Sequence, residues 1–197
     1  MKNIFLIGDS IRFGSEKSRG YEVFIREKYS DKFNIYSPNE NCRFAQYTLR
    51  ALCDWINTVD AKAIDVVYWN NGLWDVLRLN GDEPLTSIEV YIHMLERVYK
   101  KLRLFFPNAK IIFALTTPII EADAPKDFMR YNAEIEEYNA EACKLMNKLN
   151  VQINDLYSIA KEFDNSYYAD WTHFNDKGAT ILADEVIKTI ERSFKNE

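Results

Sequence analysis

Ser10, Asp170 and His173 represent the three residue types, serine, aspartate and histidine, that hydrolytic enzymes combine for nucleophilic attack. Ser10 directly follows Gly8-Asp9, and Asp170 precedes His173 by three residues near the opposite end of the chain. An imidazole can take the proton of a serine hydroxyl while a carboxylate holds its second nitrogen. If folding brings the two segments together, Ser10 is a candidate nucleophile, His173 a candidate base, and Asp170 the carboxylate that orients it.

Each of these residues also has an interpretation without chemistry. Ser10 is suited to cap a helix that follows it, because serine side chains accept hydrogen bonds at helix starts. An Asp close to a His also arises by chance. The other histidine, His93, lies inside a predicted helix and one position off its apolar stripe, so we expect it to be a partly exposed structural residue.

The elements that must position these residues follow from the alternation of short apolar runs and longer helical stretches. Strands are predicted at residues 2–7, 33–36, 64–69, 110–115 and 151–154. Helices are predicted at residues 20–29, 45–58, 129–149, 155–163 and 176–193, with one more helix after Thr86. Thr86 and Glu89 match a capping box for that helix, and Ile181, Leu182, Val186 and Ile190 are expected to face inward from the last one.

This alternation predicts an α/β fold, a three-layer α/β/α sandwich with a flavodoxin-like five-stranded parallel sheet in order 2-1-3-4-5. The chain contains no linker or repeat, so we predict one domain over residues 1–197. Open parallel sheets bind ligands beyond the carboxyl ends of their strands. Gly8-Asp9-Ser10, Asn70-Asn71-Gly72 and Thr116-Thr117-Pro118 follow three predicted strands, and we expect them to converge at that edge.

Two segments at the two ends of the chain resemble the GDSL/SGNH hydrolase superfamily. Residues 4–12, with the sequence Ile-Phe-Leu-Ile-Gly-Asp-Ser-Ile-Arg, look like its first block. Asp170-Trp171-Thr172-His173 looks like its last block, the DxxH motif. The resemblance covers essentially the whole chain. It implies the SGNH hydrolase fold, a catalytic triad of Ser10, His173 and Asp170, and serine esterase activity.

The middle blocks of this chain depart from the family pattern. The third block is usually GxND, with an Asn that donates to the oxyanion, whereas here it reads Gly72-Leu73-Trp74-Asp75. It is similar to a variant that would make Asn70 the candidate donor, with Asn71 as second choice. The second block normally offers a Gly N–H; Asn41-Cys42-Arg43 occupies that region, so Asn41 or a neighbouring backbone N–H is the candidate there.

Four further residues near the expected edge have two interpretations each. Arg12 either pairs with a carboxylate such as Asp75 or steers an anionic or polar substrate. Trp69, Trp74 and Trp171 either pack in the core or line the cleft, where they could stack on a sugar ring or hold an acyl chain.

Composition excludes several other classes of function. The net charge of −5 and the absence of a Lys/Arg run argue against a nucleic-acid partner. No apolar stretch has the length of a signal peptide core or a membrane span, so we expect a cytoplasmic protein that does not bind membranes. Cys42, Cys53 and Cys143 form no CxxC pair and are expected to be small buried thiols. Two histidines and scattered cysteines leave no sensible metal site, and no cofactor is implied.

The sequence therefore predicts a serine esterase that hydrolyses a small-molecule carboxylic ester through an acyl-enzyme on Ser10. A small acyl or acetyl ester, such as an acetylated carbohydrate, is the expected substrate. Two alternatives remain open from the residues alone. One is a non-catalytic binding module on the same fold, and the other is an acyltransferase that uses the same triad.

Overall fold

A five-stranded parallel sheet forms the centre of the computed structural model, which describes residues 1–195. The strand order is β2-β1-β3-β5-β7, which confirms the predicted order 2-1-3-4-5. The strands are β1 (Lys2–Ile7), β2 (Phe33–Tyr36), β3 (Val66–Trp69), β5 (Lys110–Ala114) and β7 (Gln152–Asn154). β1 lies between β2 and β3, with Ile4 paired with both Ile35 and Val66.

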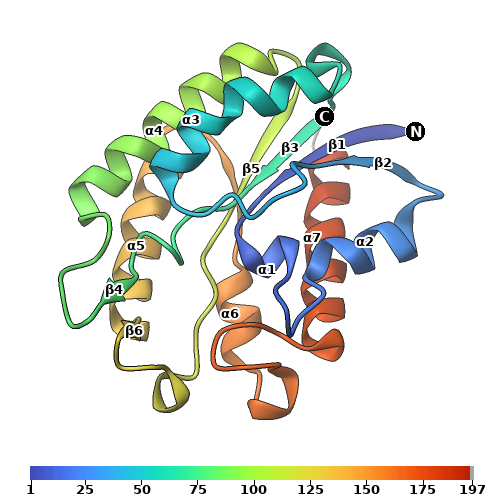
Figure 1. The fold of residues 1–197 in the computed structure, drawn as a ribbon. Coiled ribbons are helices and arrows are strands. Elements are labelled where there is room, and N and C mark those ends of the chain that lie inside the picture. The colour runs from blue at the N-terminus through green and yellow to red at the C-terminus, as the bar shows by residue number, and fades with distance from the viewer. Residues whose placement is uncertain (196–197) are drawn as a thin grey trace.

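Helices cover both faces of the sheet, so the fold is the expected three-layer α/β/α sandwich (Figure 1). α2 (Tyr21–Tyr29) and α6 (Leu156–Lys161) pack beside α7 (Asp176–Lys195) on one face. On the other face α4 (Ile88–Phe105) packs between α3 (Ala45–Trp55) and α5 (Asn132–Lys148). Because both faces are covered, the central strands are apolar along their length. All four residues of β3 and the last four of β1 are buried.

Two short features of the structure were not predicted from the sequence. The four-residue helix α1 (Ser10–Phe13) follows β1 directly. A two-stranded antiparallel sheet joins β4 (Arg78–Leu79) to β6 (Phe128–Met129). Strands of two residues are too short to show any periodicity in sequence. The β4–β6 pair connects the segment after β3 with the segment before α5, at the lower left of Figure 1.

Several predicted boundaries and one cap differ from the structure. α5 begins at Asn132 because the residues just before it belong to β6 and its following loop. The capping box predicted for α4 is wrong: Ser87 is the N-cap, and the hydroxyl of Thr86 donates instead to Gln46. In α7 Leu182, Val186 and Ile190 are buried as predicted, but Ile181 is 37% exposed.

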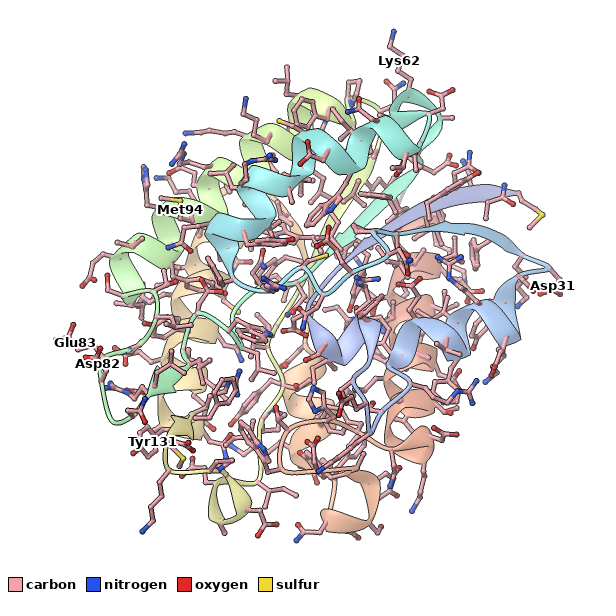
Figure 2. All side chains as sticks on the ribbon, in the orientation of Figure 1. Asp31, Lys62, Asp82, Glu83, Met94 and Tyr131 are labelled. Carbon is pink, nitrogen blue, oxygen red and sulfur yellow. The ribbon has the colours of Figure 1, made fainter. Side chains whose placement is uncertain are left out.

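Single-turn 3-10 helices lie in the connections between the larger elements. The turns lie at Ile56–Thr58, Ala61–Ala63, Glu121–Asp123 and Asn165–Tyr167. Charged side chains such as those of Asp31 and Lys62 project from the periphery, as Figure 2 shows. Within residues 1–195, no helix combines the length and the apolar character that a membrane crossing requires.

Candidate active site

Ser10 stands at the carboxyl end of β1, where the chain turns directly into α1. Asp9 is the N-cap of this helix, and its Oδ1 accepts a hydrogen bond from the N–H of Ile11 at 2.9 Å. The cap is therefore Asp9, and the hydroxyl of Ser10 is not used for capping. As the first residue of α1, Ser10 has a backbone N–H without a partner in the helix.

The side chains of Ser10, His173 and Asp170 form one continuous hydrogen-bonded chain. His173 Nε2 lies 2.9 Å from Ser10 Oγ, and His173 Nδ1 lies 2.9 Å from Asp170 Oδ2. Asp170 and His173 belong to the loop between the turn at Asn165–Tyr167 and α7, which passes below α1 in Figure 1. The structure thus brings together the three residues singled out from the two ends of the sequence.

The loop that carries Asp170 and His173 is held by its own hydrogen bonds. Asp170 Oδ1 accepts the backbone N–H groups of Thr172 at 2.9 Å and His173 at 2.8 Å. Ala169 N donates to His173 O at 2.7 Å, which closes the turn around the carboxylate. The three-residue spacing of the motif therefore lets one carboxylate fix both the loop and the imidazole.

The electrostatics of Asp170 suit it to orient a neutral imidazole. Partial burial raises the pKa of this carboxyl, but the hydrogen bonds from His173 and Thr172 outweigh burial and lower it below the ordinary value. An ionised Asp170 keeps the proton of the neutral ring on Nδ1. Nε2 is then an acceptor that faces the Ser10 hydroxyl.

Asn70 and Asn71 are placed differently from Asn41 relative to Ser10. The Asn70 amide donates to Ala114 O at 2.9 Å, and the residue is absent from the lining of the cavity beside Ser10. The fully buried Asn71 accepts from Trp69 Nε1 at 2.6 Å and donates to Thr48 Oγ1 at 2.9 Å. Both amides therefore tie the end of β3 to its neighbours.

Asn41 does line the cavity beside Ser10. Its Oδ1 accepts the N–H of Arg43 at 2.9 Å, which leaves Nδ2 as its donor. The segment is fixed against β1, because Cys42 N donates to Gly8 O at 3.1 Å. Arg43 has φ of 50°, a left-handed conformation that glycine adopts most easily. The chain thus keeps a glycine-like backbone turn in the region where the family block normally has a Gly.

A cavity of about 500 Å³ opens beside Ser10 and His173. Trp74, Phe128 and Trp171 line it, with edge-on ring contacts from Phe128 to both tryptophans. Trp69, in contrast, is fully buried in the sheet. Of the two interpretations given for these tryptophans, core packing therefore holds for Trp69, and lining of the cleft holds for Trp74 and Trp171.

Arg130 also lines this cavity, and the sequence analysis did not identify it. It is only 2% exposed, and its guanidinium lies 5.9 Å from the ring centre of Trp74, 5.2 Å from Phe128 and 5.3 Å from Trp171. Burial lowers the pKa of Arg130 to about 10, so the side chain remains a cation at neutral pH. No motif marks it, because it lies between β6 and α5 in a stretch predicted as helix.

Arg12 is a structural residue, but its partner is not Asp75. It is 1% exposed, forms an ion pair with Glu22, and donates through Nε to Gly8 O at 3.2 Å. These contacts hold the turn after β1 against α2. The predicted pairing with Asp75 is wrong: the sequence places Glu22 in a predicted helix, but it does not show that this side chain faces Arg12.

Asp75 is fully buried and contacts the start of α3. Its Oδ1 accepts the N–H of Ala45, the first residue of α3, at 3.2 Å, while Oδ2 has no hydrogen-bond partner. Burial raises the pKa of Asp75 to about 7.

The turn after β3 requires a glycine at position 72. Gly72 has φ of 145°, and a Cβ at this position would lie 2.1 Å from Thr116 Oγ1.

The remaining candidates fall outside the cavity. His93 is exposed on α4. Cys42 is buried as expected, but Cys53 is exposed and Cys143 is half-buried, so the expectation of three buried thiols is wrong. Over residues 1–195, no three His, Cys, Asp or Glu side chains gather in a way that could hold a metal ion.

Comparisons with known proteins agree with this fold. The family model described as the GDSL-like Lipase/Acylhydrolase family matches residues 6–181. A GDSL esterase/lipase from Arabidopsis thaliana is 24% identical over 95% of this chain, and the match spans 63% of the plant protein's length.

Two solved structures share the fold. The lipase/acylhydrolase from Enterococcus faecalis superimposes with a TM-score of 0.78 at 17% identity, over 98% of this chain and 97% of that one. A family 3 carbohydrate esterase from Clostridium thermocellum gives a TM-score of 0.70 at 19% identity, over 96% of each chain. With nearly the whole sequence matched, the chain belongs to the GDSL-like lipase/acylhydrolase family.

Proposed function

We propose that this chain is a serine esterase that hydrolyses small acyl esters through an acyl-enzyme on Ser10. The observation that carries the proposal is the hydrogen-bonded chain from Asp170 through His173 to Ser10, which lies at a cavity of about 500 Å³. Family membership supports the same class of reaction.

The geometry of each residue in the triad fits one role in the reaction. His173 Nε2, 2.9 Å from Ser10 Oγ, takes the hydroxyl proton as Oγ attacks the acyl carbonyl. The ionised Asp170 stabilises the imidazolium that forms. His173 then gives its proton to the leaving alcohol, and an ester forms on Ser10. A water molecule, deprotonated by His173, attacks this acyl-enzyme and releases the acid.

For the oxyanion we propose two donors, the backbone N–H of Ser10 and the Nδ2 of Asn41. Ser10 N–H is free because it begins α1. Asn41 lines the same cavity, and its Oδ1 is held by Arg43, so that its amide is oriented before substrate binds. Preorganised donors of this kind stabilise the charge that develops in the tetrahedral intermediate. Asn70 and Asn71, whose amides serve neighbouring groups, are not proposed for this role.

The proposed substrate is a short acyl ester, such as an acetyl ester, of a ring-bearing alcohol. A cavity of about 500 Å³ is in the range that holds small molecules. Trp74, Phe128 and Trp171 line the cavity and give it aromatic surface against which a ring, including that of a sugar, can pack. The carbohydrate esterase from Clostridium thermocellum, which shares the fold, supports a carbohydrate ester.

A fluorophosphonate probe tests the proposal directly, because it traps an activated serine. Wild-type protein should be labelled on Ser10, and labelling should be lost in Ser10→Ala and nearly lost in His173→Ala. His93→Ala is the matched control, because His93 is exposed on α4, and it should be labelled like wild type. If wild type and His173→Ala react equally slowly, Ser10 is not activated and the protein is a binding module.

Hydrolysis and acyl transfer are then separated with the same ester. Incubation of 4-nitrophenyl acetate with and without an added sugar alcohol shows where the acetyl group goes. Acetate as the main product supports the esterase, whereas acetylated alcohol as the main product would make the chain an acyltransferase.

A further inference from the structure

Arg130 is buried beside the candidate active site and forms no salt bridge within residues 1–195; the buried Asp9 is the one carboxylate there that acts on its charge, from beyond salt-bridge distance. The neighbouring Tyr131 is 43% exposed and lies at the outside of the molecule near β6 (Figure 2), whereas Arg130 is 2% exposed. The two side chains therefore point in opposite directions, and the guanidinium reaches inward. There its Nε donates to Leu73 O.

The hydrogen-bonding capacity of this guanidinium is only partly used. Its Nη1 is buried and has no hydrogen-bond partner among the described residues, and no carboxylate of residues 1–195 forms a salt bridge with it. The aromatic rings of Trp74, Phe128 and Trp171 partly compensate the buried charge through cation–π contacts. A buried cation with an unmade hydrogen bond is costly unless a ligand completes it.

A second buried polar atom without a partner belongs to a residue that lines the same cavity. The Oγ1 of Thr172 is buried without a partner, and both Thr172 and Arg130 line the cavity that contains Ser10 and His173. The acidic residue in the lining, Asp127, is exposed, so that water screens its charge. The interior of the cavity therefore combines one cation, a free hydroxyl and three aromatic rings.

We propose that Arg130 binds a carboxylate of the substrate, so that the preferred esters carry an anionic group within reach of the bond that is cleaved. This inference rests on the proposed esterase function. A carboxylate has two oxygens that match the planar fork of a guanidinium, and Thr172 Oγ1 offers a further donor. The rings of Trp74, Phe128 and Trp171 would contact the apolar part of the same molecule.

The alternative role for Arg130 is donation to the oxyanion of the transition state. That oxyanion is a single oxygen, and Ser10 N–H and Asn41 Nδ2 are already available to it. A guanidinium used in this way would assist every ester equally, charged or neutral. The two roles therefore differ in a measurable quantity, the ratio of kcat/KM between an anionic ester and its neutral analogue.

Two matched pairs of esters measure this ratio. 4-Acetoxybenzoate and 4-acetoxybenzamide differ in charge on the alcohol side, and the 4-nitrophenyl monoester of adipic acid and its primary amide differ on the acyl side. In the wild type, kcat/KM should favour the anionic member of at least one pair by about ten- to a hundredfold, the worth of a charge-assisted hydrogen bond. Arg130→Met should bring that ratio close to one, mainly through KM, and Arg130→Lys should retain part of it.

Arg50→Met is the control for net charge, because Arg50 is exposed on α3 outside the cavity; its ratio should equal that of wild type. Equal rates within both pairs in the wild type would overturn the inference and leave the esterase proposal intact. A loss in Arg130→Met that is the same for anionic and neutral esters would also overturn it, in favour of the transition-state role.

A binding measurement keeps the test independent of turnover and of the stability of Arg130→Met. Calorimetric titration of Ser10→Ala with 4-hydroxybenzoate and with 4-hydroxybenzamide compares the same charge difference without catalysis. Binding of the benzoate at least about tenfold more tightly than the amide supports the inference. If the wild type discriminates only the acyl-side pair, Ser10→Ala is titrated instead with the adipate monoester and its amide. Equal affinities within the pair that corresponds to the kinetic preference contradict the inference. If the wild type hydrolyses none of the four esters but Ser10→Ala still prefers the benzoate, the esterase proposal fails and the anion site stands.

Discussion

Asp75→Asn should make the stability of the protein less sensitive to pH between mildly acidic and mildly basic conditions. Asp75 is fully buried, one of its oxygens accepts the N–H of Ala45, and the other has no hydrogen-bond partner. Burial raises its pKa to about 7, so the folded protein holds a proton that the unfolded chain gives up at lower pH. Asn keeps the size of the side chain and the acceptor for Ala45 without the ionisable group.

The sign and size of the effect follow from proton linkage. A carboxyl whose pKa is raised by folding stabilises the folded state fully below its unfolded pKa of about 3.9, and this stability is lost as pH rises towards the folded pKa. The difference between about 3.9 and about 7 corresponds to about 4 kcal/mol. The free energy of unfolding of Asp75→Asn should therefore be close to that of wild type at about pH 4. At about pH 8 it should exceed the wild-type value by up to about 4 kcal/mol.

Urea denaturation of both proteins at several pH values measures this difference. Carboxylates with lowered pKa, such as Asp170, give a slope of the opposite sign, but they contribute equally to both proteins and cancel. Asp31→Asn is the surface control, because Asp31 is exposed at the edge of the molecule (Figure 2), and the pH-dependent gain in stability of Asp75→Asn should exceed that of this variant. A pH-independent difference for Asp75→Asn would show that Asp75 takes up no proton on folding.

Four predictions concern the candidate active site and the strand end beside it. Ser10→Ala and His173→Ala should each remove nearly all ester hydrolysis, and the double variant should be scarcely worse, whereas losses that multiply would contradict a single catalytic unit. Asp170→Asn should be milder than either, since the base is misoriented but present. Asn41→Ala should lower kcat about 10²–10³-fold, as for loss of one oxyanion donor, with a nearly unchanged melting temperature. Asn70→Ala should leave kcat nearly unchanged but lower the free energy of unfolding by about 1–3 kcal/mol, because Ala114 O loses its side-chain donor.

The elements with strong periodicity were predictable, and the short elements were not. The strands Lys2–Ile7 and Phe33–Tyr36 match their predicted bounds, because apolar runs between turn residues leave few alternatives. β4 and β6 have two residues each and exist only through their mutual pairing. The start of α5 was placed too early for the same reason, since local sequence gives no sign that β6 pairs with a distant strand.

In the candidate site, residues within sequence motifs were easier to find than residues that depend on tertiary contacts. Ser10, Asp170 and His173 were singled out because their types and local spacing suggest chemistry. The direction of the Asn70 amide depends on Ala114 in a neighbouring strand, which spacing does not reveal. Arg130 becomes a candidate only when its burial and its unpaired Nη1 are known.

The contact between Ser10 and His173 joins residues that are 163 positions apart. Ser10 follows the first strand and His173 precedes the last helix, so the sheet between them must be assembled before these side chains can meet. Contacts of such long range are late and slow to form, because the closure of a long loop costs entropy before any contact repays it. Recovery of Ser10 labelling during refolding would thus follow completion of the whole sheet, and would lag behind the recovery of helical signal.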